Sequence, residues 1–287
     1  MKLVLALLAI ALLTFLAACT VNPLQTFNAL VPKDGGSSQV ADGVAYAEGD
    51  RRRLDIYAPD DSDGSPRPVI VWFYGGSWNS GTRNGYDFVG RALASRGFVT
   101  VIPDYRLVPD VRFPGFVEDG ANAVRWVRTN IPDYGGDGER IVLGGHSAGA
   151  YIAAMLANDG RWLGDDRAAI RGMVGLAGPY DFAPFDVSAS IEAFGQWPDP
   201  ADTQPVTFAD ASAPPALLLT GEEDATVQPR NSEALAAKLQ SAGVDAQVKR
   251  YPGVDHINIV VAMSRIRRGR APVLDDVTDF ARRVSEP

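Results

Sequence analysis

The chain of 287 residues is poor in the residues that build metal centres and disulfides. Its single cysteine leaves no disulfide to form within the chain, and its two histidines make a zinc site hard to assemble. No run of lysine or arginine indicates a nucleic-acid surface, and the net charge of −8 disfavours a polyanionic partner. The sequence therefore implies no metal, no organic cofactor and no nucleic acid.

The N-terminus lacks an apolar run long enough for a typical membrane-spanning helix. The mainly apolar stretch 3–16 has 14 residues, whereas a spanning helix needs roughly 20. Because Lys2 precedes it and small residues follow it, we predict that residues 1–18 are a secretory signal, with a transmembrane anchor as the alternative. The end of this segment, Leu-Ala-Ala-Cys, resembles a bacterial lipobox. That resemblance implies that Cys19 is lipidated and anchors the chain to a membrane of the bacterial envelope, on the periplasmic or outer-membrane face.

Composition changes again after the predicted signal. Residues 19–42 are polar and contain prolines, glycines and serines, so we expect the lipidated Cys19 to be followed by a flexible tether. Residues 43–287 have the pattern of a folded domain, and a hydrophobic content of 46% is enough to build a sizeable core.

Within that domain, short apolar runs alternate with helical patterns. The strands expected from these runs are residues 44–48, 54–57, 68–74, 98–102, 141–143, 172–176, 216–219 and 246–251. The clearest helical patterns are residues 87–95, 116–130, 148–158 and 231–241, the last with Asn231 and Gly243 as expected caps. Alternation of this kind predicts an α/β fold, with a mostly parallel central sheet of about eight strands and helices on both faces.

The segment around Ser147 carries the strongest chemical signal. A G-x-S-x-G sequence, with glycines at 145 and 149, joins the predicted strand at 141–143 to an Ala-rich predicted helix. A turn this tight needs glycine two residues on either side of Ser147, because a Cβ there would clash with the neighbouring strand or helix. We therefore predict a nucleophile elbow that holds the Ser147 hydroxyl at the carboxyl end of the sheet.

A serine nucleophile needs a general base, and the two histidines leave few choices. His146 precedes the nucleophile, where the turn directs its side chain away from the Ser147 hydroxyl. His256 follows the last predicted strand, at the sheet edge where ligands of such sheets bind. We therefore assign the base to His256, and we expect activity to fall in acid as the imidazole becomes protonated.

The third residue must hold the imidazole of His256 in one tautomer. Asp224 follows a buried strand and a turn glycine and is the best placed of the acidic residues. Its rivals are Glu222, Glu223 and Asp255. The resulting order of Ser147, Asp224 and His256 is the order found in α/β-hydrolases.

Negative charge that develops on a substrate oxygen needs backbone N–H donors. The amide of Ala148 is expected to supply one, as the residue after the nucleophile. Gly76 and Ser77 follow a predicted central strand and are placed to supply the others. The alternative is that the glycine pair at 75–76 forms an ordinary turn.

Together these motifs resemble the α/β-hydrolase fold of the esterase and lipase group. That group includes hormone-sensitive-lipase-like carboxylesterases, BD-FAE-type esterases and kynurenine formamidase relatives. The matching motifs are residues 74–78 for H-G-G-G-W, 104–107 for D-Y-R-L, 135–137 before the elbow strand, and 145–149. The resemblance implies that Ser147 is the nucleophile, that Asp224 and His256 complete the triad, and that the amides of Gly76, Ser77 and Ala148 form the oxyanion hole.

Two positions depart from the pattern of the group. Tyr74 replaces its histidine and Ser77 replaces its third glycine, but neither change removes a backbone donor. We expect altered rigidity of this loop rather than lost chemistry. Asp104 and Arg106 are expected to be structural.

The sequence thus predicts a carboxylesterase-type serine hydrolase (EC 3.1.1 class) that cleaves small to medium acyl esters through an acyl-enzyme. The alternatives are a formamidase or other amidase, an acyltransferase, and a non-catalytic lipoprotein that binds a ligand. Residues 180–215 should govern substrate choice. Their aromatic side chains either line an acyl pocket or seal the edge of the sheet; they are Phe182, Phe185, Phe194, Trp197 and Phe208.

Overall fold

The computed structural model describes residues 23–61 and 64–286. The predicted signal and Cys19 lie outside these residues. No helix within the described ranges is long and apolar enough to cross a bilayer.

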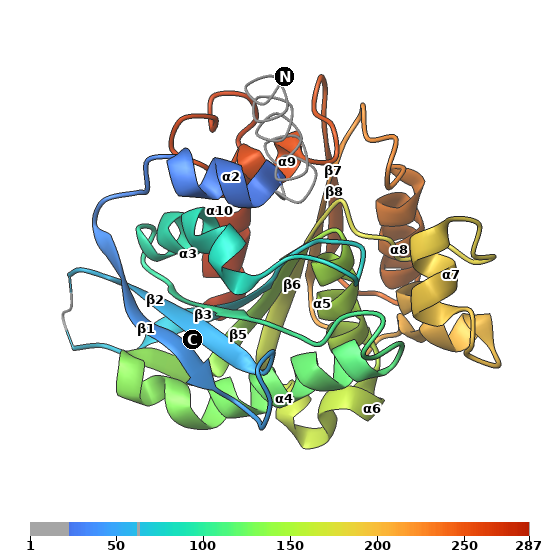
Figure 1. The fold of residues 1–287 in the computed structure, drawn as a ribbon, viewed down its shortest axis with the longest axis horizontal. Helices are drawn as coiled ribbons and strands as arrows, with labels where there is room; N and C mark the ends of the chain where they lie inside the picture. Colours follow the sequence, from blue (N-terminus) through green and yellow to red (C-terminus); the bar gives the residue numbers. More distant parts are fainter. Residues whose placement is uncertain (1–22, 62–63, 287) are drawn as a thin grey trace, which may run out of the picture.

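A single sheet of eight strands runs through the domain (Figure 1), in the order β1-β2-β4-β3-β5-β6-β7-β8. The strands are β1 (Ser37–Ala45), β2 (Arg53–Pro59), β3 (Arg67–Phe73), β4 (Val99–Pro103), β5 (Gly136–His146), β6 (Ile170–Leu176), β7 (Ala216–Gly221) and β8 (Ala246–Tyr251). β1 and β4 both pair antiparallel with β2, and all other neighbours are parallel. The predicted α/β architecture is confirmed.

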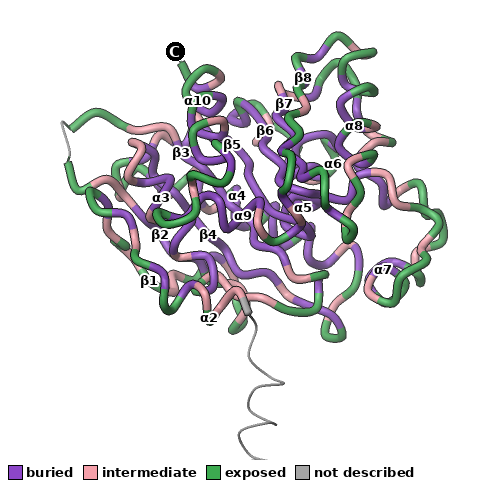
Figure 2. The backbone as a smooth tube through the Cα atoms, turned by 90° about the horizontal axis from the view of Figure 1, so that it is seen from above, coloured by how far each residue is buried: buried purple, intermediate pink, exposed green. Residues whose placement is uncertain are grey.

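Helices cover both faces of this sheet. α3 (Asp87–Ala94) and α10 (Val273–Ser285) pack on one face, and α4 (Gly115–Asn130), α5 (Ala148–Asn158) and α8 (Arg230–Ser241) pack on the other. Shorter helices lie at the periphery: α2 (Pro23–Leu30), α6 (Gly160–Leu163), α7 (Ser188–Phe194) and α9 (Asn258–Val261). The central strands are buried along their length, as Figure 2 shows, because a parallel sheet covered on both faces leaves its side chains no solvent.

The N-terminal part of the domain differs from the expected tether. Residues 23–42 are not irregular, because they contain α2 and most of β1. β1 is an edge strand with two register shifts against β2, and most of its side chains are at least partly exposed. An edge strand with these features lacks the apolar alternation by which strands are found in a sequence. Ser37 nevertheless lies buried and donates to the carbonyl of Arg91 at 2.9 Å, which ties this strand to α3.

Candidate active site

The turn between β5 and α5 has the strained geometry of a nucleophile elbow. Ser147 has φ 54° and ψ −123°, a conformation that side chains of L-residues rarely adopt. A Cβ on Gly145 would lie 2.5 Å from the carbonyl carbon of Gly149, and a Cβ on Gly149 would lie 2.1 Å from the carbonyl oxygen of Phe73. The predicted requirement for glycine on both sides of Ser147 is therefore confirmed.

Ser147, His256 and Asp224 form one line of hydrogen bonds. The Oγ of Ser147 lies 2.9 Å from Nε2 of His256, and Nδ1 of the same ring lies 2.8 Å from Oδ2 of Asp224. The carboxylate can only accept, so Nδ1 carries the proton and Nε2 is left to accept from the serine hydroxyl. All three residues are at least nine-tenths buried, which strengthens these bonds by excluding water. Such an arrangement can move a proton from the serine to the imidazole.

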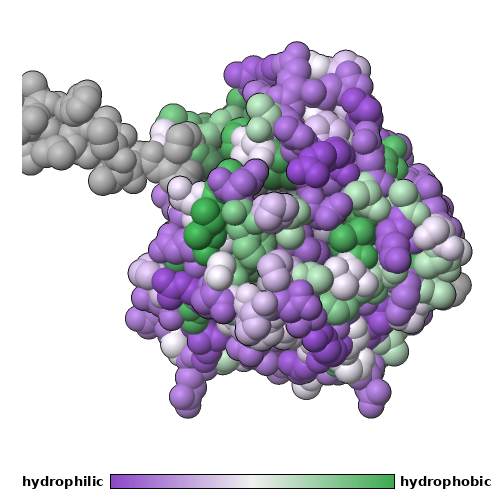
Figure 3. Space-filling model, turned by 90° about the vertical axis from the view of Figure 1, so that its right-hand side faces the viewer, coloured by the Kyte–Doolittle hydropathy of each residue, from purple (hydrophilic) through white to green (hydrophobic). Residues whose placement is uncertain are grey.

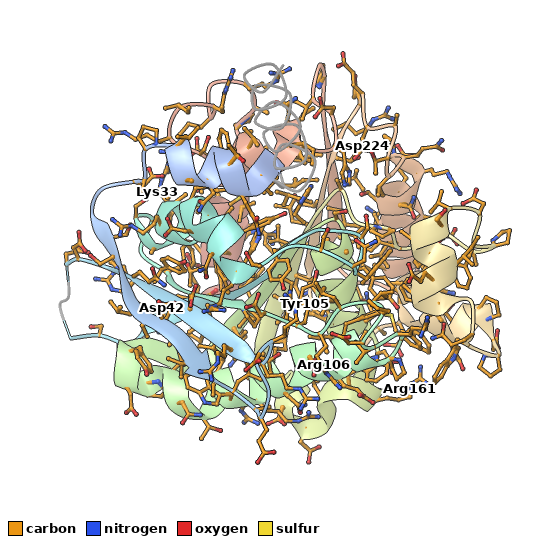
Figure 4. The ribbon with its side chains drawn as sticks, viewed as in Figure 1. Lys33, Asp42, Tyr105, Arg106, Arg161 and Asp224 are labelled. Atoms are coloured by element: carbon orange, nitrogen blue, oxygen red, sulfur yellow. The ribbon has the colours of Figure 1, made fainter. Side chains whose placement is uncertain are left out.

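The loops that carry the acid and the base are held against each other. A Cβ on Gly221 would lie 2.1 Å from the carbonyl oxygen of Val254, so the end of β7 touches the backbone just before His256. The second carboxylate oxygen of Asp224 accepts from the amides of Thr226 and Val227 at 2.9 and 2.8 Å. In Figure 4, Asp224 lies above the end of β7, at the edge of the sheet.

The acidic rivals of Asp224 make other contacts. Glu222 and Glu223 are exposed. Asp255 accepts from the amides of Ile257 and Asn258 at the start of α9, and the hydrogen bond from the Asn258 amide is the main cause that lowers the pKa of this carboxyl. None of these three carboxylates contacts the imidazole of His256.

His146 points away from the Ser147 hydroxyl, as predicted, and holds two loops together. Its Nε2 donates to the backbone carbonyl of His256 at 2.8 Å, so its Nδ1, 2.9 Å from the Tyr86 hydroxyl, must accept from that hydroxyl. The same hydroxyl accepts from the amide of Gly75 at 3.0 Å. Burial, and next the nearby His256, lower the pKa of His146 to about 3, so the ring stays neutral. Sequence analysis missed Tyr86, because nothing in its local sequence marks it.

The loop after β3 contains backbone N–H groups without acceptors among the described residues and lines the same cavity as Ser147. It is a turn in which the carbonyl of Gly76 accepts from the amides of Asn79 and Ser80, and Gly76 and Ser77 both have positive φ. Within the described chain, the amides of Gly76, Ser77 and Ala148 have no hydrogen-bond acceptor. Three N–H groups without partners beside a buried hydroxyl can hold a negatively charged oxygen.

Buried polar and aromatic contacts at the ends of β3 and β4 stabilise this loop. The hydroxyl of Tyr74 accepts from Arg51 at 2.7 Å, and its ring stacks on Tyr105 with centroids 4.6 Å apart. Asp104 pairs with Arg83 at 2.6 Å.

Arg106 pairs with the buried Asp119 at 2.8 Å. Arg106 and Tyr105 lie below the catalytic edge in Figure 4. Neither Asp104 nor Arg106 touches the triad side chains, which agrees with the structural role expected for them.

A cavity of about 340 Å³ opens onto Ser147. It is lined by Ser77, Trp78, Ser147, Pro179, Phe182, Ala183, Pro184, Asp186, Val187, Ala189, Ser190, Ala225, Thr226, Val227, Gln228, Arg230 and Asn231. Apolar surface forms separate patches on the face that carries α7 and α8 (Figure 3).

The aromatic residues of the segment 180–215 divide between the two roles considered for them. Phe182 lines the cavity and stacks on Trp78, with ring centroids 6.0 Å apart. Phe194 is buried behind them, 4.8 Å from Trp78, and seals the space under α7. Phe208 lies apart from the cavity, under the guanidinium of Arg161 at 4.6 Å.

The side chain of Asn231 does not cap α8 but binds the backbone of the segment that lines the cavity. Its side-chain oxygen accepts from the amides of Tyr180 and Asp181, both at 3.0 Å. The expected cap is therefore wrong, and α8 begins one residue earlier, after Pro229.

Comparison with known proteins finds one matching family and relatives that are named as esterases. The BD-FAE family model matches residues 54–239. A probable isoprenylcysteine alpha-carbonyl methylesterase of Oryza sativa subsp. japonica is 31% identical in an alignment 270 residues long, which covers 84% of this chain and 62% of that protein. The chain spans about three fifths of the length of the curated plant relatives that it matches.

Solved structures share the fold. A truncated carbohydrate esterase from gut microbiota is 22% identical, with a TM-score of 0.76 over 89% of this chain and 99% of that one. A thermostable carboxylesterase cloned from a metagenomic library is 24% identical, with a TM-score of 0.73 over 92% of this chain and 94% of that one. Likeness at these identities establishes the α/β-hydrolase fold.

Proposed function

Because this chain belongs to the BD-FAE family, we propose that it is a serine carboxylesterase. The observation that carries the proposal is the hydrogen-bonded line from Ser147 through His256 to Asp224. The esterase names of the relatives and structural neighbours support the same reaction.

The geometry supports an acyl-enzyme mechanism. Ser147 Oγ attacks the ester carbonyl carbon while Nε2 of His256 takes the hydroxyl proton. The carbonyl oxygen becomes an oxyanion held by the amides of Gly76, Ser77 and Ala148. When the carbon–oxygen bond to the alcohol breaks, His256 returns the proton to the leaving alkoxide.

The second half of the cycle uses the same groups. A water gives its proton to His256 and attacks the acyl carbon, and the Ser147 ester bond then breaks as the proton returns to Oγ. Asp224 keeps the proton of the neutral ring on Nδ1 and stabilises the imidazolium that forms in each half.

Small to medium acyl groups fit the site best. The cavity of about 340 Å³ has an apolar wall formed by Trp78 and Phe182, and the segment 180–215 is short for an interfacial lid. The same groups can attack an N-acyl bond, so a formamidase remains the second candidate.

We also propose that Cys19 carries lipid and anchors the domain in the bacterial envelope. The lipobox-like sequence before Cys19 supports this. Membrane fractions of cells that express the full chain should contain it, whereas a Cys19→Ser chain should lack the mass of the lipid.

The activity can be tested on residues 20–287, which keep every contact described above. We would follow hydrolysis of p-nitrophenyl esters from acetate to laurate, with N-formylkynurenine as the amide substrate, beside Ser147→Ala. Ester turnover that is lost in the variant supports the esterase, and the chain-length optimum sizes the acyl site. Cleavage of the formyl substrate alone would select the formamidase, and a folded chain silent on all substrates would contradict both.

A further inference from the structure

A second cavity borders the residues that follow the catalytic histidine. It has a volume of about 330 Å³ and lies between α2 and α9, which are neighbours in Figure 1. Four apolar side chains line this cavity: Leu24, Phe27, Ile257 and Val261. The polar residues of its lining are Asn258, Arg267 and Arg270. The cavity has no part in the mechanism above.

Exposed isoleucines and arginines surround this cavity. Ile257 is 49% exposed and Ile266 is 56% exposed, although large apolar side chains are rarely so exposed in this domain. Apolar surface also gathers at the upper left of Figure 3, on the side of α2. An apolar patch with a charged rim is typical of an interaction surface.

The segment 264–270 concentrates positive charge in an acidic protein. It contains four arginines, whereas the whole chain has a net charge of −8. Arg268 is held by Asp34 at 2.8 Å, which fixes the segment beside the end of α2. In the described part of the chain, the guanidinium groups of Arg265 and Arg267 have no ion pair or hydrogen bond. Arg270 donates to the carbonyl of Gly253 at 3.4 Å, and its charge helps to lower the pKa of Asp255. Three exposed cations are therefore available to a partner.

We propose that the surface formed by α2, α9 and residues 264–270, which we call the arginine face, docks onto a bilayer that contains anionic phospholipid. Guanidinium groups would meet lipid phosphates, while the isoleucines and the apolar cavity would meet acyl chains. Charge complementarity selects this partner, because an apolar protein surface would leave three arginines unpaired. The lipidation proposed for Cys19 agrees with this partner, since α2 begins at Pro23, close to Cys19 in the sequence.

Docking in this way would bring the catalytic edge of the sheet to the membrane. Ile257 is the residue after the base His256, and Asn258 and Val261 belong to the helix that follows it. The active site would then take esters that lie in the bilayer or at its surface. This last step rests on the proposed hydrolase activity, but the docking itself does not.

The test is vesicle co-sedimentation of residues 20–287, which lack the lipidation site. We expect binding to vesicles of phosphatidylglycerol and phosphatidylcholine in equal parts, little binding to phosphatidylcholine alone, and release by salt. Replacing Arg265, Arg267 and Arg270 by Gln should lower the partition coefficient by on the order of a hundredfold. Ile266→Asn should lower the fraction of protein that stays bound at high salt, because that fraction depends on the contact of apolar side chains with acyl chains.

The control for charge replaces Arg171 of β6 and Arg282 and Arg283 of α10 by Gln, which changes the net charge equally at residues outside the arginine face. An equal loss in this control, equal binding to both vesicle types, or a stable dimer that buries the arginine face would overturn the proposal. Thermal unfolding confirms that each variant is folded, and turnover of p-nitrophenyl acetate in solution should be unchanged in the Arg265, Arg267 and Arg270 variant. If no substrate is cleaved but the vesicle preference persists, only the proposed hydrolase activity fails.

Discussion

The Nε2 of His146 donates to the backbone carbonyl of His256 at 2.8 Å, so the residue before the nucleophile holds the loop that carries the base. With Tyr86 on its other nitrogen, the ring connects that loop to the loop with the free amides. The chain of hydrogen bonds begins at the amide of Gly75, which can only donate, and ends at the carbonyl of His256, which can only accept. The direction of each bond in between is therefore fixed.

The first prediction concerns this connection. Tyr86→Phe removes the group that accepts from the Gly75 amide and donates to His146, and it leaves both buried and unpaired. We expect the free energy of unfolding to fall by about 1–3 kcal/mol. We also expect kcat to fall about tenfold with a smaller change in KM, because the donors for the transition-state oxygen lose their alignment. Tyr134→Phe, at a half-buried tyrosine remote from the site, is the control and should change neither quantity.

The second prediction concerns acid stability. The pKa of His146 is about 3 in the folded chain and about 6.5 when unfolded, so between these values the unfolded state binds one more proton. Stability is therefore complete above about pH 6.5 and falls as pH drops toward 3, by at most about 1.4 kcal/mol per pH unit. Urea unfolding at several pH values gives the slope of the unfolding free energy against pH, which measures the number of protons taken up on unfolding. Between pH 3 and 6.5 this number should be smaller by about one in His146→Gln than in the parent. Equal slopes would mean that the imidazole is not held neutral.

The third prediction separates Asp224 from Asp255 as candidates for the acid. Asp224→Asn keeps an oxygen for the amides of Thr226 and Val227 but places an NH₂ group opposite Nδ1 of His256, which favours the wrong tautomer. We expect kcat to fall by about 10⁴-fold with the fold intact. Asp255→Asn is its matched partner and should keep most of the activity, since that side chain contacts α9 rather than the imidazole. A larger loss in the Asp255 variant would reverse the assignment.

The fourth prediction concerns strain at the elbow. At φ 54° and ψ −123° a Cβ is strained and glycine is not, so Ser147→Gly should be more stable than Ser147→Ala by about 1 kcal/mol. Both variants lose the same hydroxyl, and both should be inactive. Chemical denaturation of the pair measures the difference, and a more stable alanine variant would show that the elbow is relaxed.

The parts of the site set by local sequence could be predicted. The glycines at 145 and 149 identify the elbow because the clash that they avoid lies within the same turn or with the adjacent strand. The position of Asp224 after a buried strand placed the acid without any knowledge of its contacts. The strands at the centre of the sheet were found because each contains a short apolar run that is buried on both faces, such as residues 141–143 of β5.

Contacts between distant segments could not be predicted in this way. Tyr86 meets His146 across 60 residues of chain. The side chain of Asn231 accepts from the amide of Tyr180 and does not cap its own helix. An asparagine at the start of a helical pattern predicts a cap, so the sequence alone gives the wrong role. The strand predicted at residues 44–48 overlaps only the last two residues of β1 (Ser37–Ala45), and the rest of β1 was taken for a tether because an edge strand with bulges and polar side chains has the composition of a loop. The role of Cys19 stays a prediction, since it lies outside the described residues.

The wall of the substrate cavity contains residues 179–190, between β6 and β7, whereas Ser147, Asp224 and His256 follow β5, β7 and β8. The wall therefore contributes shape but no reacting group. Its sequence is free to drift, lengthen or be exchanged while the proton path stays in place. Changes within residues 179–190 can thus alter the shape of the cavity without touching the proton path, whereas Trp78 and residues 225–231, which line the rest of it, lie next to the oxyanion loop and the acid.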